Sequence, residues 1–414
     1  MPNEFAQLLL EAIDFVLFIL PIAIPIILLY FGIDMFISYK RTKHMNSLEW
    51  VLLEISPPAE VKKSPVAMEV FLLALHQTGG ESDWYTRYIK GSFRSWFSLE
   101  LVSIEGAIKY FIRAEKKHIR SIEANLYSQY PGIEISEAKK DYTDGFTYNK
   151  EKNNLFCAEL ELTKPDPYPI KTYVDYRLDS EQEDEYKVDP IAPILEFLNT
   201  VKPRNNVWFQ IIVRAHKKED PDLSKVFPSL SEKKDNWTES GREEIKKIRE
   251  EGFIEVEEGE SKKKAGQQTE GQKEMISALE RSLSKFAFDV GIRLMAIAPK
   301  DDFDKGNIGM LGVWKQYSSV NLNGFKPGLK TDFDWWYQDP FKTKIHKIKK
   351  EMLDAYKTRN YFWKDDYKGN PRKYFILNTE ELATIYHFLG KVTEAPSISS
   401  VDSRKSSPPS NLPI

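Results

Sequence analysis

Residues 15–33 read FVLFILPIAIPIILLYFGI, an uncharged run that lies between Asp14 and Asp34. About 19 to 23 apolar residues are enough for a helix to cross a hydrocarbon core of roughly 30 Å. A buried helix of a soluble protein would show a polar face, which this run lacks. Pro21 and Pro25 each remove a backbone donor, and a spanning helix tolerates this as a kink where neighbouring groups satisfy the freed carbonyls. The run therefore predicts one kinked transmembrane helix.

The flanks of this run predict its processing and its orientation. Residues 1–14 hold acidic side chains and no Lys or Arg, so they lack the positive region of a cleaved signal peptide. Lys40, Arg41 and Lys43 follow the run at once, and the positive-inside rule places that end in the cytoplasm. We therefore expect residues 1–45 to form a short external N-terminus and a single-pass anchor in the cell membrane, with the C-terminal domains in the cytoplasm.

The composition is compatible with a membrane-tethered cytoplasmic protein. The chain of 414 residues is long enough for an anchor and two domains of ordinary size. Its net charge of −3 gives no global reason to bind nucleic acid or anionic lipid, and leaves room only for a local basic patch. The single cysteine, Cys157, excludes an intramolecular disulfide and a cysteine-rich zinc site, and it fits a reducing compartment.

Residues 46–216 are predicted to form a first α/β domain. Glu105-Gly106 marks a tight hairpin turn within it, because glycine supplies the positive φ that such a turn needs. The first half of this domain is expected to contain a strand over 48–55, a helix over 64–76, a hairpin over 97–113, a helix over 119–130 and a short strand over 133–136.

The second half of this domain repeats a similar order. Residues 154–163 alternate, with apolar side chains on one face and Glu159 and Glu161 on the other, which predicts a strand whose polar face looks at water. Asp189 caps a helix, and residues 207–215 (VWFQIIVRA) read as a strand buried on both faces. The succession strand, helix, strand, strand, helix, strand predicts a ferredoxin-like α/β sandwich within an α+β protein.

Residues 217–273 differ in character from the rest of the chain. Charges of both signs are dense, aliphatic residues are sparse, and KKKAGQQTEGQ is low in complexity. Such a segment buries too little apolar surface to offset its ordering entropy, which predicts a disordered, solvated insertion. An alternative for residues 239–251 is a solvated helix supported by opposite charges at four-residue spacing.

Residues 274–390 are predicted to form a second α/β domain, and the Pro- and Ser-rich residues 391–414 a disordered tail. The expected elements are a helix over 275–286, a strand over 290–298, a helix over 307–317, an irregular loop over 321–336, an amphipathic helix over 345–356 with Lys344, Lys347, Lys349 and Lys350 on its other face, a strand over 374–377 and a short helix capped by Asn378 or Thr379.

Motifs that carry catalytic chemistry are absent from the sequence. The chain has no P-loop, no G-x-S-x-G, no H-E-x-x-H and no C-x-x-C. No two of its six histidines have the spacing of a helix-borne metal site. The carboxylate pairs Asp301-Asp302 and Asp365-Asp366 lie in turn-like contexts, where solvation is a simpler role than acid and base work. We therefore expect a protein that is not an enzyme and that has no catalytic, cofactor-binding or metal-binding residues.

Three passages carry a resemblance to a known family. They are SLEWVLLEISPPAEVKKSPVAMEVFLLALH (47–76), SLELVSIEGAIKYFIRAEKKHIRSIEANLYSQYPGIEISEA (98–138) and YFILNTEELATIYHFLGKVTEAPSISSVDSRKSSPPSNLPI (374–414). Together they resemble the membrane-anchored N-terminal region of bacterial type IV secretion and conjugation ATPases, and uncharacterised stand-alone relatives that lack the ATPase domain. In such ATPases the passage ending in ELATIYHF lies just ahead of the nucleotide-binding domain. The resemblance implies that the motor comes from another chain, so no catalytic residue carries over, and Leu389 stands where a proline would be expected.

These observations favour a non-enzymatic scaffold or adaptor at the membrane, part of a type IV secretion or conjugation-like translocation system, that pairs with an ATPase in trans. A homo-oligomer would suit this role. An alternative is a single-stranded DNA-binding module, with Trp335, Trp336, Tyr337 and Trp363 as stacking platforms beside lysines, although aromatic clusters are also common in cores. A third possible function is that of a membrane-bound hydrolase.

The apolar side chains of residues 374–388 must pack against another protein surface to be shielded from water. We expect this segment either to dock on the partner ATPase or to pack on the chain's own second domain.

Overall fold

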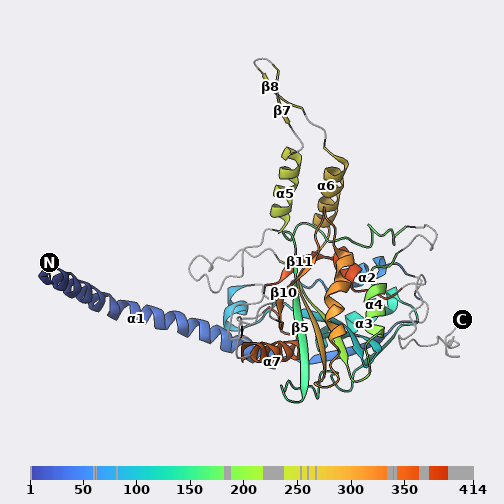
Figure 1. The fold of residues 1–414 in the computed structure, drawn as a ribbon, viewed down its shortest axis with the longest axis horizontal. Coiled ribbons are helices and arrows are strands. Elements are labelled where there is room, and N and C mark those ends of the chain that lie inside the picture. Colours follow the sequence, from blue (N-terminus) through green and yellow to red (C-terminus); the bar gives the residue numbers. More distant parts are fainter. Residues whose placement is uncertain are drawn as a thin grey trace. The chain divides into compact units, whose positions relative to one another are not determined.

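The computed structural model of the chain describes residues 2–58, 61, 63–80, 83–180, 188–217, 237–251, 254–258, 261–265, 268–332, 339, 343–362 and 373–389. It is a mixed α+β protein with one N-terminal apolar helix and an antiparallel sheet (Figure 1). The chain divides into two compact units, one made of residues 1–48, 79–94 and 219–234 and the other of residues 49–78, 95–218 and 235–414.

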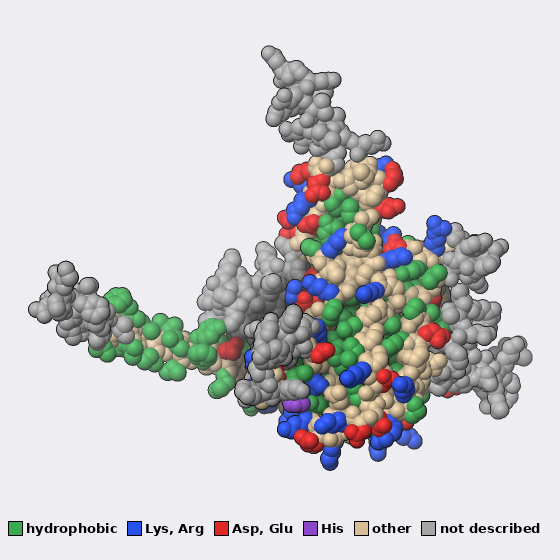
Figure 2. All heavy atoms as spheres, in the orientation of Figure 1, with side chains coloured by type: hydrophobic (Ala, Val, Ile, Leu, Met, Phe, Trp, Pro, Cys, Tyr) green, Lys and Arg blue, Asp and Glu red, His purple; other side chains and the backbone are tan. Residues whose placement is uncertain are grey.

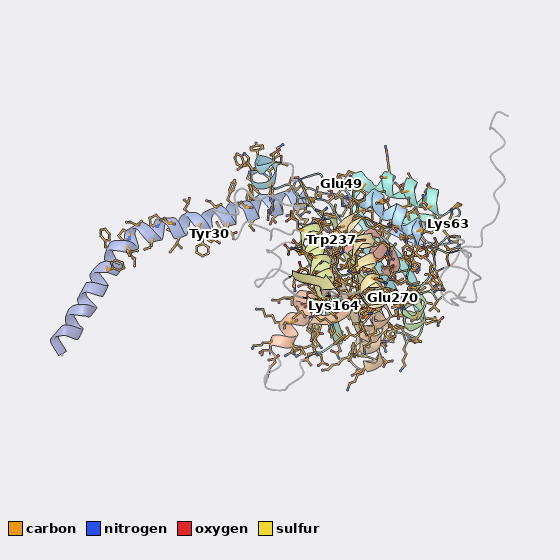
Figure 3. The ribbon with its side chains drawn as sticks, turned by 90° about the horizontal axis from the view of Figure 1, so that it is seen from above. Tyr30, Glu49, Lys63, Lys164, Trp237 and Glu270 are labelled. Carbon is orange, nitrogen blue, oxygen red and sulfur yellow. The ribbon has the colours of Figure 1, made fainter. Side chains whose placement is uncertain are left out.

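The first unit is dominated by α1 (Pro2–Asn46), which contains the predicted apolar run. Within it, Leu17–Asn46 is long and apolar enough to cross a membrane. The helix bends on the N-terminal side of Tyr30 (Figure 3), the region where Pro21 and Pro25 interrupt the backbone hydrogen bonds. The same unit holds η1 (Tyr85–Ile89), a short π-helix.

The second unit contains the remaining helices and strands of the described chain. In its first part these are β1 (Trp50–Ser56), α2 (Val66–Leu75), β2 (Trp96–Ile104), β3 (Ala107–Glu115), η2 (Lys116–His118), α3 (Ile119–Gln129) and β4 (Glu134–Glu137). Then follow β5 (Asn153–Leu162), α4 (Ala192–Asn199), β6 (Asn206–Ala215), α5 (Trp237–Glu251), β7 (Ile254–Glu258), β8 (Ser261–Ala265) and α6 (Glu270–Leu283). The last are β9 (Ala287–Pro299), η5 (Lys305–Tyr317), β10 (Phe325–Lys330), α7 (Thr343–Thr358), β11 (Phe375–Asn378) and α8 (Thr379–Ile385).

The nine strands outside the β7–β8 hairpin form one antiparallel sheet in the order β10-β5-β9-β6-β2-β3-β1-β4, and β11 pairs with the start of β9. The sheet is built from two sets of four strands with the same internal arrangement. In chain order, the first set lies as second, third, first, fourth strand (β2-β3-β1-β4), and so does the second set (β6-β9-β5-β10). The two sets meet where β2 pairs with β6, from Trp96 opposite Arg214 to Ile104 opposite Asn206.

The sheet runs across the boundary that the sequence predicted between two α/β domains. β9, which belongs to the predicted second domain, lies between β5 and β6 of the first. β10 also pairs with β5, although its residues were expected to form an irregular loop. That expectation was wrong because Pro327 and Gly328 read as loop residues, whereas an edge strand accommodates a proline.

The predicted hairpin is confirmed. β2 and β3 pair from Ser98 opposite Arg113 to Ile104 opposite Ala107. Glu105 has a φ of 54° and Gly106 a φ of 94°, which is the positive-φ pair of a tight two-residue turn. The local turn chemistry therefore sets the register of these strands.

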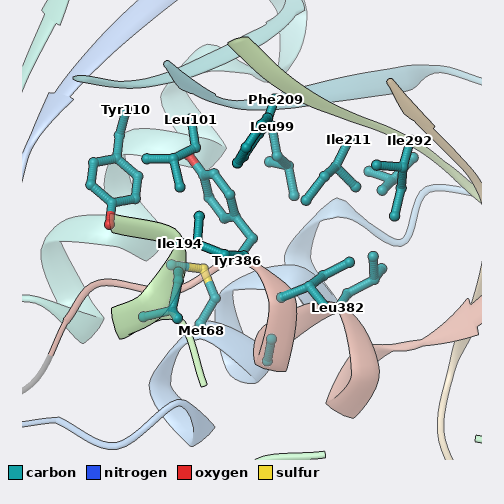
Figure 4. Close-up of a cluster of buried hydrophobic side chains, with 14 of the residues drawn as sticks. Met68, Leu99, Leu101, Tyr110, Ile194, Phe209, Ile211, Ile292, Leu382 and Tyr386 are labelled. Carbon is teal, nitrogen blue, oxygen red and sulfur yellow. The ribbon is translucent and has the colours of Figure 1, made fainter. Parts of the chain in front are cut away.

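Both faces of the sheet are buried, and they differ in chemistry. The larger core lies between the sheet and α2, α3, α4, η5 and α8. Figure 4 shows Leu99, Phe209 and Ile292 of three neighbouring strands on the side of Met68 and Leu382. The opposite face is covered by α7, whose Met352, Leu353 and Tyr356 pack on Val102, Cys157, Trp208 and Met295.

Candidate functional site

The aromatic residues proposed for DNA stacking, Trp335, Trp336, Tyr337 and Trp363, lie outside the described residues, as do Asp365 and Asp366. Among the described residues, no group of three or more His, Cys, Asp and Glu side chains could hold a metal ion.

The lysines of α7 are partly engaged within the chain. Lys349 Nζ donates to Asn154 Oδ1 at 2.8 Å, and burial lowers the pKa of Lys349. Lys347 Nζ lies 3.9 Å from Glu351 Oε1, one turn along the same helix. These two side chains are consequently less available to a phosphate backbone than the sequence pattern implies.

The C-terminal segment packs on the chain's own sheet, which was one of the two expected alternatives. β11 pairs with β9, and Leu382, Ile385 and Tyr386 of α8 and the residue after it are almost fully buried in the large core. Asn378 caps α8 by accepting from Glu381 N–H at 2.9 Å, and Glu381 accepts from Asn378 N–H at 2.9 Å. The apolar side of this segment is therefore covered without a partner.

A polar cluster is buried under α7, at the joint between the two sets of strands. Glu100 of β2 lies opposite Gln210 of β6, and Gln210 lies opposite Arg293 of β9. Gln210 donates to Glu100 Oε1 at 3.1 Å, and Arg293 Nε donates to Glu159 Oε1 at 3.1 Å. Glu159 is thus buried and paired, and the expectation that the polar face of its strand looks at water was wrong for it.

Arg359 closes this cluster from the residue after α7. Its guanidinium makes two bonds to Glu100, at 2.9 and 3.1 Å, and a second pair to Asp141. Arg359 has a φ of 54°, a left-handed conformation that turns the chain at the end of the helix. Tyr142 OH also donates to Glu100, at 2.8 Å.

The electrostatics of the cluster are those of a structural ion pair. Burial alone would raise the pKa of Glu100, but the Arg359 guanidinium and the hydrogen bonds outweigh it and hold that pKa below its usual range. Glu100 and Arg359 are nearly inaccessible to solvent, so the pair has no open side for a substrate. The arrangement can fix α7 to the sheet.

Within the charged residues 217–273, the predicted alternative of a helix over 239–251 is confirmed by α5, although this helix is packed on one side rather than fully solvated. α5 and α6 lie side by side and stand out from the sheet (Figure 1), with Ile245, Ile248, Ile276 and Leu279 between them. We call this helix pair the arm. The sequence signal was available: each helix carries two apolar side chains three residues apart, and Thr269 with Gln272 forms a capping box.

A shallow groove runs along the arm, with a volume of about 480 Å³. Arg242, Lys246 and Arg249 of α5 line one side, and Glu280 and Leu283 of α6 the other. Arg249 bonds to Glu280 at 2.8 Å. Figure 2 shows charged side chains of both signs over the visible face of the arm. The groove is open, with a basic wall and a small apolar floor, which suits an acidic peptide segment rather than an enclosed small molecule.

The exposed surface of α1 is the other candidate. From Leu17 to Tyr39 its large apolar side chains are mostly exposed, and hydrophobic atoms cover the described part of the helix in Figure 2. None of its most apolar window is buried inside the protein. A contiguous apolar surface of this size on a soluble chain would require a cover.

The fold and these surfaces define a class: an α+β protein with a nine-stranded antiparallel sheet, a protruding helix pair and an exposed apolar N-terminal helix. Residues 39–322 match the model of the DUF8128 family, a domain of unknown function, and the chain belongs to that family. No curated protein matches the sequence.

Proposed function

We propose that this protein is a membrane-anchored scaffold or adaptor in a translocation system of the type IV secretion or conjugation kind. It would work with an ATPase supplied by another chain. The observation that carries the proposal is α1: Leu17–Asn46 has the length and composition of a membrane span and none of its most apolar window is buried in the protein. The hydrocarbon core of a bilayer would surround the exposed apolar side chains of such a helix.

The proposed orientation places the sheet in the cytoplasm. Lys40, Arg41 and Lys43 follow the apolar run, and positive residues next to a span favour the cytoplasmic side. The test is a pair of reporters fused after Ile414, one active only in the cytoplasm and the other only outside. Activity of the first alone, with the protein resistant to alkaline extraction, is the expected result. Activity of the second alone would reverse the orientation.

We also propose that each set of four strands is a ferredoxin-like unit. The support is the succession strand, helix, strand, strand, helix, strand in both sets, together with the strand order second, third, first, fourth. In the second set, the arm and the β7–β8 hairpin are inserted between the second and third strands. An insertion of this kind leaves the sheet intact and presents the arm for binding.

The arm is the surface we assign to the partner ATPase. The resemblance of residues 47–76, 98–138 and 374–414 to the N-terminal region of such ATPases supports a partner of this class. The docking segment cannot be α8, whose apolar side is buried. The groove on the arm offers exposed Arg242 and Lys246, which favour an acidic segment of the partner. Lys246 lies 3.8 Å from Glu250 on its own helix, and Arg249 is bonded to Glu280, so the partner would compete with these two pairs.

The experiment is co-purification of the full chain, solubilised in detergent, with a translocation ATPase encoded beside it. Reversing charge at Arg242 and Lys246 to Glu is expected to abolish co-purification, while Lys150→Glu with Lys152→Glu, exposed on a distant turn, leaves it unchanged. Retention of the ATPase by the arm variant would exclude this surface. Capture of single-stranded DNA in place of any ATPase would instead favour the DNA-binding alternative.

A further inference from the structure

A short segment of the chain packs on the end of α1, within the first unit. Residues 83–94 contain η1, which lies beside the C-terminal part of α1 (Figures 1 and 3). A Cβ atom at Gly91 would stand 2.5 Å from the Lys40 carbonyl carbon and 2.7 Å from Arg41 N, so only glycine permits this approach. The Phe93 and His44 rings are 5.0 Å apart, edge to face. We call residues 34–46 and 83–94 together the platform.

The platform begins where the apolar run ends. Lys40 lies six residues beyond Asp34, which is about 9 Å along a helix axis. The polar headgroup layer on each side of a bilayer is roughly 5 to 8 Å thick. If α1 spans a membrane, as the proposed function requires, Gly91 contacts the helix at the level where lipid headgroups meet water.

The exposed side chains of the platform are amphipathic aromatics. Trp84 is 62% exposed, Tyr85 50% and Tyr39 61%. Asp83 holds the start of η1, because its carboxylate accepts from Thr86 N–H at 2.7 Å. Trp and Tyr concentrate at membrane interfaces, where the ring sits among headgroups and the polar tip stays hydrated. Two such side chains at the start of a capped turn are therefore positioned for a lipid surface.

The charge of the platform is strongly positive, in contrast to the chain as a whole. Its sequence holds six Lys or Arg side chains and two Asp, and all six except Arg94, which is buried, lie at least partly exposed. Lys90 Nζ lies 5.6 Å from the Tyr85 ring and Arg87 lies 5.6 Å from the Tyr88 ring. Basic side chains beside interfacial aromatics match the anionic lipids of a cytoplasmic leaflet. The platform is therefore a local basic patch in a chain whose overall net charge is −3.

We infer that the platform is a second membrane contact, which binds the anionic headgroup layer through Trp84, Tyr85, Arg87 and Lys90. The inference rests on the proposed membrane anchor. Its consequence is mechanical: a single helix can tilt freely in the bilayer, whereas a second headgroup contact, held against α1 through Gly91, limits that tilt.

The test uses the full chain in bilayers of phosphatidylcholine, with or without phosphatidylglycerol, that carry a quencher on the lipid headgroup. A fluorophore is attached at Tyr85→Cys in a Cys157→Ala background; Cys157 is buried. Matched labels are placed at Lys150→Cys, on an exposed turn, and at Leu28→Cys, inside the apolar run, where the quencher is carried on the lipid acyl chain instead of the headgroup. We expect strong quenching at position 85, stronger with phosphatidylglycerol, and none at position 150.

Two variants test the named contacts. Each basic side chain near an anionic surface favours contact about fivefold, so Arg87→Glu with Lys90→Glu should weaken quenching at position 85 at least that much. Gly91→Val should also weaken it, because the segment is forced away from Lys40. Neither variant should alter quenching at position 28 by an acyl-chain quencher.

The possible results distinguish failure of the proposed headgroup contact from failure of the proposed membrane anchor. Quenching at position 28 without quenching at position 85 would overturn the inference and leave the anchor in place. Absence of quenching at both positions would overturn the anchor, and the inference with it. A label at position 85 that is shielded from both the lipid quencher and aqueous iodide would show a protein surface there, such as a second copy, and would also overturn the inference.

Discussion

The two faces of the sheet are both largely apolar, but they differ in chemistry at the joint between the two sets of strands. Leu99, Ile211 and Ile292 lie opposite one another on β2, β6 and β9, and all point into the large core. One residue further, Glu100 is opposite Gln210, which is opposite Arg293 on the face under α7. Both rows are almost fully buried.

The comparison shows two ways in which helices are held on a sheet, by burial of apolar side chains and by buried ion pairs. Apolar burial is non-directional, so many side chains of similar volume can fill the large core. A buried charge requires its partner at a fixed distance, since an unpaired one costs several kcal/mol. At the joint between the two sets of strands, a shift of one residue would bring Glu100 and Arg293 into the apolar core. We interpret the polar row as a device that fixes strand register there, and the first prediction tests it.

The largest effect is expected on the polar face. Arg359→Met leaves the Glu100 carboxylate buried without its cation, so the free energy of unfolding should fall by about 3–5 kcal/mol. Urea denaturation of the full chain in detergent measures this. The control is the paired variant Glu100→Leu with Arg359→Met, which removes both charges and should be clearly more stable than the single variant. Equal losses in the two would mean that the ion pair has no coupling role.

The apolar face should respond to lost volume. Leu382 is fully buried in the large core, and Leu382→Ala should reduce the free energy of unfolding by about 3 kcal/mol through lost contact and the cavity left behind. Leu382→Met keeps the volume and should cost less than about 1.5 kcal/mol. The same denaturation assay compares them. A negligible loss for Leu382→Ala would show that α8 is not an integral part of this core.

A smaller effect is expected at the start of α8, where β11 ends. Asn378→Ala removes the side-chain acceptor for Glu381 N–H and should lower the midpoint of thermal unfolding by an amount that corresponds to about 1 kcal/mol. Asn378→Ser retains a capping oxygen and should recover most of that loss. If both variants lose the same stability, the hydrogen bond from Asn378 to Ser282 rather than the cap is responsible.

The smallest effect is a pH dependence at the rim of the apolar face. The His76 ring packs on Phe286 and Phe288, with centroids 4.8 and 5.2 Å away, and burial lowers the pKa of His76 from its usual value. The folded state therefore favours neutral histidine. The contribution of His76 is complete above about pH 6.5, the ordinary histidine pKa, and is lost as the pH falls from there through the lower pKa of the folded state.

Unfolding midpoints between about pH 7 and pH 5 measure this contribution. The slope should be shallower in His76→Gln than in the parent chain. The residual slope should come in part from His118, whose pKa is also lowered by burial. An unchanged slope in His76→Gln would show that His76 does not couple protonation to folding.

Local patterns predicted many of the elements. The turn at Glu105-Gly106, the amphipathic helix that became α7 and the cap at Asn378 all depend on residues close together in the chain. The burial of Glu159 could not be predicted in this way, because its partner Arg293 is 134 residues distant. The alternation in β5 indicated a polar face correctly, but it could not show that α7 and an arginine would cover that face.

The candidate surfaces also differ in whether local sequence patterns could predict them. The apolar run of α1 and the basic residues after it were evident from composition. The arm was predicted in part, because a helix over 239–251 was one alternative. Its packing was not predicted, since α5 is rich in charge and few of its residues are buried, Ile245 and Ile248 against α6 among them. The platform was not predicted at all, since residues 83–94 lie far along the chain from Lys40 and only the fold brings Gly91 against it.

The sequence by itself determined the apolar helix, the mixed α+β class and the strands and helices whose side chains repeat at regular spacing, because these follow from local geometry and hydrophobicity. Only the tertiary structure decided that the strands on both sides of the charged insertion form one sheet, that one face of this sheet is held by ion pairs, and that a second segment packs on the end of α1. Pairings of this kind depend on contacts between residues far apart in the chain, and no local pattern encodes them.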